Sequence, residues 1–180
     1  MNKAFETALH YIGTKEHTEK GEHNPQIVEM FSKIGHSWVK DDETAWCAAF
    51  VNFCLVINGL KQTGKLNARS FLKYAKKTDK PQTGDIVVFW RSSRNSWKGH
   101  VGFYVSEDEE NIYCLGGNQS NSVNITAYAK YRLLGYRRIE NNSPLSIQIS
   151  SIIQSEVKEA KQTIQTILNN VEANIKDLTR

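Results

Sequence analysis

Hydrophobic and polar positions in the first part of the chain repeat with the period of an α-helix. One helix is expected over residues 3–12, and a second is expected to begin at Pro25, which suits the first helical position. The apolar positions of the second helix are Ile27, Val28, Phe31 and Ile34. The charged segment 14–24 between the two helices is predicted to be a loop.

A third helix is expected over residues 45–58 and is apolar on nearly every side. Thr44 can cap its start, and Gly59 ends it. Because a helix without a polar face cannot lie at a surface, this one is predicted to be buried at the centre of a domain. Residues 67–75 suggest another, more polar helix.

After Pro81 the hydrophobic pattern changes from helical to strand-like. Strands are predicted at 85–90, 100–106, 111–115, 122–125 and 133–139, separated by clusters of Gly, Asn, Ser and Asp. Helices followed by an antiparallel sheet define an α+β fold.

The break at 141–144 separates this region from a segment of different composition. Apolar residues then recur at alternating steps of four and three, as in a heptad repeat: Ile153, Val157, Ala160, Ile164, Ile167, Val171 and Leu178, with Asn174 at one such position. We therefore expect a domain over 1–140 and a linker with an amphipathic helix over 141–180. That helix can pack on the domain, self-associate as a coiled coil through 150–178, or dock on a partner.

Composition narrows the classes of protein to which the chain can belong. The net charge is +4, which is too small to indicate nucleic-acid binding, although it would suit a negatively charged polymer such as bacterial cell wall. Three cysteines in 180 residues do not suggest a disulfide framework. No segment has the length of a membrane span, and residues 1–11 do not form a signal peptide.

Candidate chemistry is concentrated at one cysteine and one histidine. Cys47 lies in the first turn of the apolar helix, where unpaired N–H groups and the helix dipole stabilise a thiolate. His100 follows a glycine at the start of a strand, where its ring has room at a sheet edge. Asn118, at the end of the next strand, is the first candidate to orient that imidazole, and Gln119 is the second. The order suggests a papain-like thiol hydrolase.

Other uses of these residue types are less well supported. Cys54 and Cys114 are expected to be core residues, and a cysteine in an apolar helix is itself often core. No CxxC or HExxH spacing occurs, so no metal and no cofactor are expected. Gly116-Gly117 lacks the Lys-Ser/Thr of a phosphate loop and is expected to allow a close backbone approach.

Four ordered motifs together resemble the NlpC/P60 and CHAP superfamily of cysteine hydrolases. They are Trp46-Cys47-Ala48-Ala49-Phe50-Val51-Asn52, Gly84-Asp85-Ile86-Val87-Val88-Phe89, Gly99-His100-Val101-Gly102-Phe103-Tyr104 and Leu115-Gly116-Gly117-Asn118-Gln119. The resemblance extends over about residues 4–139. It implies a papain-like fold in which Cys47 is the nucleophile, His100 the general base and Asn118 the third polar residue. CHAP proteins often carry a glutamate two residues before that asparagine, where this chain has Gly116.

The resemblance also implies an amidase or endopeptidase that acts on the peptide of bacterial peptidoglycan. The expected groove residues are Trp46, Arg91, Trp97, Gln119 and Glu16, with Arg91 or Arg94 meeting a substrate carboxylate and with Glu19 and Asn24 in the same loop as Glu16. The alternative for Trp46 and Trp90 is that they are core residues and do not contact a substrate.

Such a protein resembles a phage lysin or an antibacterial effector. It would be made in the cytoplasm and would act in the periplasm or cell wall after export, injection or lysis, with an immunity or delivery protein as a candidate partner. The alternatives are a thiol hydrolase of another protein or small amide, and a non-catalytic scaffold assembled by the C-terminal coiled coil.

Overall fold

The computed structural model describes residues 2–139 together with 155, 157–159, 161–163, 165, 166 and 169. By its internal contacts the chain divides into two units, Met1–Glu140 and Asn141–Arg180. The described residues of the second unit are helical and exposed, Val157 among them. The remaining heptad positions, and with them the predicted seam, lie outside the described residues.

Three α-helices form as the periodicity predicts. They are α1 (Lys3–His10), α2 (Pro25–Lys33) and α3 (Cys47–Val56). Side-chain caps hold the first two, because Asn2 accepts from the N–H of Phe5 and Asn24 accepts from that of Gln26.

The predicted start of α3 is wrong. Trp46 is the N-cap residue and makes no side-chain capping bond, while the N–H of Thr44 binds Asp41 at 2.6 Å. Thr44 therefore belongs to the preceding turn. The first N–H groups of α3 lack a side-chain cap and remain available to other acceptors.

The second half of the unit forms the predicted antiparallel sheet, which confirms the α+β class. Its strands are β1 (Lys76–Thr78), β2 (Ile86–Trp90), β3 (Gly99–Glu107), β4 (Asn111–Gly116), β5 (Asn124–Ala129) and β6 (Leu133–Arg138), in the order β1-β6-β2-β3-β4-β5. β1 was not predicted, and residues 68–73 form a 3₁₀ helix instead of an α-helix.

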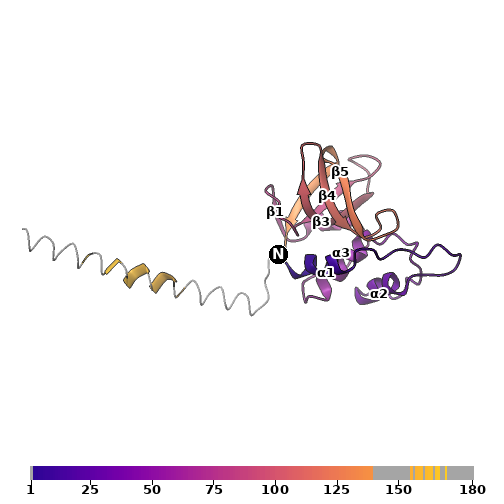
Figure 1. The fold of residues 1–180 in the computed structure, drawn as a ribbon, viewed down its shortest axis with the longest axis horizontal. Coiled ribbons are helices and arrows are strands. Elements are labelled where there is room, and N and C mark those ends of the chain that lie inside the picture. Colours follow the sequence, from indigo (N-terminus) through magenta and orange to yellow (C-terminus); the bar gives the residue numbers. More distant parts are fainter. Residues whose placement is uncertain are drawn as a thin grey trace, which may run out of the picture. The chain divides into compact units, whose positions relative to one another are not determined.

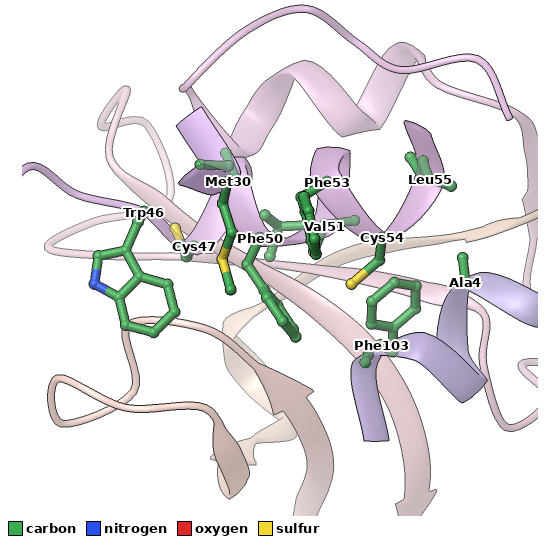
Figure 2. Close-up of a cluster of buried hydrophobic side chains, with 14 of the residues drawn as sticks. Ala4, Met30, Trp46, Cys47, Phe50, Val51, Phe53, Cys54, Leu55 and Phe103 are labelled. Carbon is green, nitrogen blue, oxygen red and sulfur yellow. The ribbon is translucent and has the colours of Figure 1, made fainter. Parts of the chain in front are cut away.

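Figure 1 shows the helices on one side of the sheet, and buried side chains form two clusters along it. The helices pack on one face, against side chains such as Val88, Val101 and Phe103. On the other face the sheet closes over its own cluster, which includes Phe89, Cys114 and Tyr128. The residues from Cys47 to Leu55 of α3 are all buried. This helix therefore forms the centre of the core between the helices and the sheet (Figure 2).

Within the described residues, no helix has the length and apolar character needed to cross a membrane.

Candidate active site

Cys47 is the first residue of α3 and borders an open pocket of about 290 Å³. Its side chain is 7 % exposed, whereas Cys54 and Cys114 are fully buried. All three cysteines are free thiols. Among them, Cys47 therefore has the thiol that a substrate could reach.

The surroundings of the Cys47 thiol favour its neutral form. Burial raises its pKa above the ordinary value, although the charge of Arg91 and the backbone N–H groups of Val101, Ala48 and Cys47 act in the opposite direction. The contact with Val101 places the sulfur beside the start of β3. His100 is the residue before Val101, so this contact brings the Cys47 thiol to the strand that carries His100.

His100 lies on β3, fully buried, with its two ring nitrogens in different surroundings. Nε2 is 2.9 Å from Oε1 of Gln119, and Nδ1 has no hydrogen-bond partner among the described residues. Burial, followed by the charge of Arg91, lowers the pKa of His100 to about 3. The Gln119 hydrogen bond acts in the opposite direction, and the charge of Arg132 lowers the pKa a little further. The imidazole is therefore neutral near pH 7.

The contacts of Gln119 determine which nitrogen of His100 carries the proton. Gln119 Nε2 lies 3.2 Å from the backbone oxygen of Cys114 and 2.6 Å from that of Asn124, so this end of the amide must donate. The other end, Oε1, accepts, and His100 Nε2 must be the donor. Nδ1 is thus left unprotonated, as a general base requires.

The orienting hydrogen bond is therefore made by Gln119 and not by Asn118. Asn118 adopts a left-handed backbone conformation with φ of 56° and lines the pocket beside Cys47. The turn is closed one residue later, where Gln119 and Ser122 exchange backbone hydrogen bonds. This geometry turns Gln119 inward, 2 % exposed, toward His100.

Gly116 explains why a glutamate is absent two residues before Asn118. A Cβ atom at Gly116 would lie 2.9 Å from Gln119 Oε1 and 3.0 Å from His100 Nε2. Any larger residue would displace the His100–Gln119 hydrogen bond, so this site depends on glycine at position 116.

An aromatic stack, which the sequence analysis missed, fixes the plane of the His100 ring. The ring of Tyr128 lies parallel to that of His100, with centroids 5.0 Å apart, and also stacks on Phe89 at 4.5 Å. Phe89 and His100 are directly paired across β2 and β3, so one tyrosine covers both. Tyr128 lies on β5, and its place in the fold depends on the pairing of β5 with β4, which the sequence does not reveal.

The predicted groove residues fall into three groups. Arg91 and Trp97 line the pocket with Cys47. Glu16 lines a second pocket that Asn118 also borders. Trp46 and Gln119 are buried and do not line either pocket, which corrects their assignment as substrate contacts.

Trp46 instead links the N-terminal loop to the start of α3. Its Nε1 donates to Glu16 Oε1 at 2.7 Å. The loop itself is held by the buried carboxylate of Asp42, which accepts from the backbone N–H groups of His17 and Asn24 at 2.9 Å each. Asn24 thus has a structural role.

Arg94 and Glu19 do not line the pocket that Cys47 borders. Arg94 donates to the backbone oxygen of Leu133 at 3.4 Å and does not line the pocket. Glu19 is exposed and lines neither pocket. Between the two arginines that the sequence offered, the structure therefore places Arg91 beside Cys47.

No group of three or more His, Cys, Asp or Glu side chains in the described residues could hold a metal ion.

A thiol at a helix start and a neutral, oriented imidazole are the residue types that a cysteine hydrolase uses. Comparison with known families agrees with this class. Residues 39–118 match the model of the CHAP domain family. The predicted resemblance is confirmed for residues 39–118, which are similar to the CHAP domain family. Because proteins of this family are typically hydrolases, the match supports a hydrolase at the level of the family.

The matched segment contains Cys47, His100 and Asn118 and ends one residue before Gln119. A solved structure similar to this chain is that of a Staphylococcus aureus subsp. aureus Mu50 protein described as similar to lipoprotein, NLP/P60 family. The sequence identity is 17 % and the TM-score 0.47, over 78 % of this chain and 41 % of that one. This chain thus corresponds to about two fifths of that protein. No curated protein sequence matches the chain.

Proposed function

We propose that the chain is a cysteine amidase or endopeptidase that cleaves amide bonds in the peptides of bacterial peptidoglycan. The observations that carry the proposal are a pocket-lining Cys47 thiol at the backbone of Val101 and, one residue before Val101, a His100 imidazole whose Nε2 is held by Gln119 and whose Nδ1 is free. The CHAP match of the same segment supports peptidoglycan as the substrate class.

The first step is attack by Cys47 on the carbonyl carbon of the scissile amide. Because both groups are neutral at rest, His100 Nδ1 takes the thiol proton as the S–C bond forms. The negative charge moves to the carbonyl oxygen. The uncapped N–H groups at the start of α3 are positioned to stabilise this oxyanion.

The second step releases the amine and then the acid. The imidazolium of His100 returns its proton to the leaving nitrogen, the C–N bond breaks, and a thioester to Cys47 remains. A water molecule then gives a proton to His100 and attacks the thioester. Collapse of this intermediate releases the carboxylic acid and restores the Cys47 thiol.

In this mechanism the third member of the site is Gln119, and Asn118 has a different role. We propose that Asn118 contacts the substrate, because it borders both the pocket that Cys47 lines and the pocket that Glu16 lines. Trp97, which is 72 % exposed at the pocket, is proposed to pack against the peptide or sugar.

Action in the periplasm or cell wall, after export, injection or lysis, is part of the same proposal. Self-association or docking through 150–178, and binding to an immunity or delivery protein, also remain proposals. They can be tested independently of catalysis by measuring the mass of the full chain in solution.

The experiment that tests the function is digestion of purified peptidoglycan, followed by mass spectrometry of the soluble products. The wild-type chain should release muropeptides, and their masses would distinguish an amidase from an endopeptidase. Cys47→Ala should release none. Cys54→Ala is the matched control, since it removes a buried thiol from the same helix and should retain activity.

The absence of products with the wild type, over several wall chemistries, would refute the peptidoglycan substrate. Cleavage of another protein or small amide that depends on Cys47 would then support the alternative thiol hydrolase. Wild-type activity in Cys47→Ala would refute the nucleophile itself.

A further inference from the structure

The pocket beside Cys47 combines cations with apolar walls. Two of its lining side chains, Arg91 and Lys98, are positively charged. The others are Ala45, Cys47, Leu66, Asn67, Ala68, Trp97, Gly99 and Asn118. No acidic residue lines this pocket, which lies wholly within the described residues 2–139. Nothing in its wall therefore neutralises the two cations.

Arg91 differs from the other described arginines in having no acceptor for its guanidinium. Within residues 2–139, the other arginine side chains all donate to oxygen atoms of the protein: Arg69, Arg94, Arg132, Arg137 and Arg138. The Arg91 backbone is nevertheless fixed, because its N–H donates to the oxygen of Lys98 at 3.2 Å. A fixed backbone with an unpaired guanidinium is suited to bind an external anion.

The charge of Arg91 also acts on the reacting groups. Against the effect of burial it lowers the pKa of the Cys47 thiol, and it adds to burial in lowering the pKa of His100. Arg91 also lines the same pocket as Cys47, whose thiol attacks the substrate in the proposed mechanism. An anion bound to Arg91 would therefore lie near the scissile bond.

The pocket on the other side of Asn118 has the opposite character. It is lined by Glu16, Glu43 and His17, with Thr18 and Asn121, and Asn118 borders both pockets. A substrate carboxylate would be repelled there and attracted on the Arg91 side. The two pockets thus give the substrate one electrostatically favoured orientation.

We infer that Arg91 makes the site selective for peptides that carry a free carboxylate close to the scissile amide, and that it binds that carboxylate directly. This inference rests on the proposed function, because it names the substrate class of the same site. It predicts that a peptide whose carboxylate has been converted to a carboxamide is a poorer substrate.

The first test does not need hydrolysis. The rate of Cys47 alkylation is measured at pH 8 with iodoacetate, which is anionic, and with iodoacetamide, which is neutral, using peptide mapping by mass spectrometry. Both reagents form an S–C bond at Cys47 and release iodide. In Arg91→Gln the ratio of the iodoacetate rate to the iodoacetamide rate should fall by about five- to tenfold.

Two variants make this result specific. Arg91→Lys retains the charge and should retain most of the wild-type ratio. Arg94→Gln removes the same charge from the same loop, at a side chain that points to Leu133, and should leave the ratio unchanged. An unchanged ratio in Arg91→Gln, or an equal loss in Arg94→Gln, would overturn the inference.

The second test compares two synthetic stem peptides that differ only in carboxylate or carboxamide next to the cleaved bond. The wild type should favour the carboxylate in kcat/KM by about tenfold, and Arg91→Gln should lose that preference. If Arg91→Gln retained the preference, the inference would fail although the hydrolase stood. If no peptide were cleaved but the alkylation ratio depended on Arg91, the proposed function would fail although the anion site stood.

Discussion

Replacing Gln119 by leucine should reduce catalysis strongly while leaving a folded protein. The side chain accepts from His100 Nε2 at 2.9 Å and donates to the backbone oxygens of Cys114 and Asn124. Leucine has a similar size but no polar atoms. The imidazole would then lose the one contact that determines its tautomer, so that Nδ1 would no longer be kept unprotonated.

The magnitude follows from the buried groups that the substitution leaves unpaired. His100 Nε2–H has no water access, and a buried unsatisfied donor costs about 1–3 kcal/mol. Because the hydrogen bonds to the two backbone oxygens are lost as well, we expect a loss of roughly 2–4 kcal/mol from a free energy of unfolding that is typically about 5–15 kcal/mol. We expect kcat to fall by about 10²-fold, which corresponds to about 2.7 kcal/mol of transition-state stabilisation.

The assay combines peptidoglycan digestion with ¹⁵N NMR of His100, at a temperature where urea unfolding shows each variant to be folded. The wild type should show a protonated Nε2 and an unprotonated Nδ1, and Gln119→Leu should show a mixture. Asn118→Gly is the matched control, because glycine adopts the left-handed conformation of residue 118 while removing the side chain. A larger loss of kcat in Asn118→Gly than in Gln119→Leu, or a wild-type imidazole protonated at Nδ1, would refute the assignment.

Substitutions at three positions test His100 and its surroundings. Because the folded-state pKa of about 3 lies below the ordinary value of 6.5, the stabilisation from neutral His100 is complete above pH 6.5 and is lost as the pH falls toward 3. Urea unfolding should therefore show the wild type losing about 2 kcal/mol more than His100→Gln between pH 7 and pH 5, and equal losses would contradict this pKa. Tyr128→Leu should reduce kcat by about tenfold through loss of the stacked ring, whereas Tyr128→Phe should retain it; equal rates for the two variants would argue against the stack. Gly116→Ala should reduce kcat nearly as much as Gln119→Leu, since its Cβ would displace the hydrogen bond, and a fully active Gly116→Ala would show that this bond is not required.

Much of the fold could be predicted because its elements have strong local signals. The apolar run of α3 has no polar face, so its burial follows from the sequence, and Pro25 marks the start of α2. The short edge strand β1 has no such signal. Its residues, Lys76–Thr78, are polar and mostly exposed, and they form a strand because β6 pairs with them.

The sequence by itself determined the α+β order of elements and the placement of Cys47 at a helix start and His100 at a strand start. These follow from periodicity and from glycine and proline positions, which act over a few residues. Only the tertiary structure decided that Gln119 orients the imidazole while Asn118 faces the pocket. Two adjacent amides have the same local chemistry, and the backbone conformation of the turn directs one outward and the other inward. The burial of Trp46 and the position of Tyr128 over His100 likewise depend on strands and loops that are distant in sequence, so residue patterns alone could not reveal them.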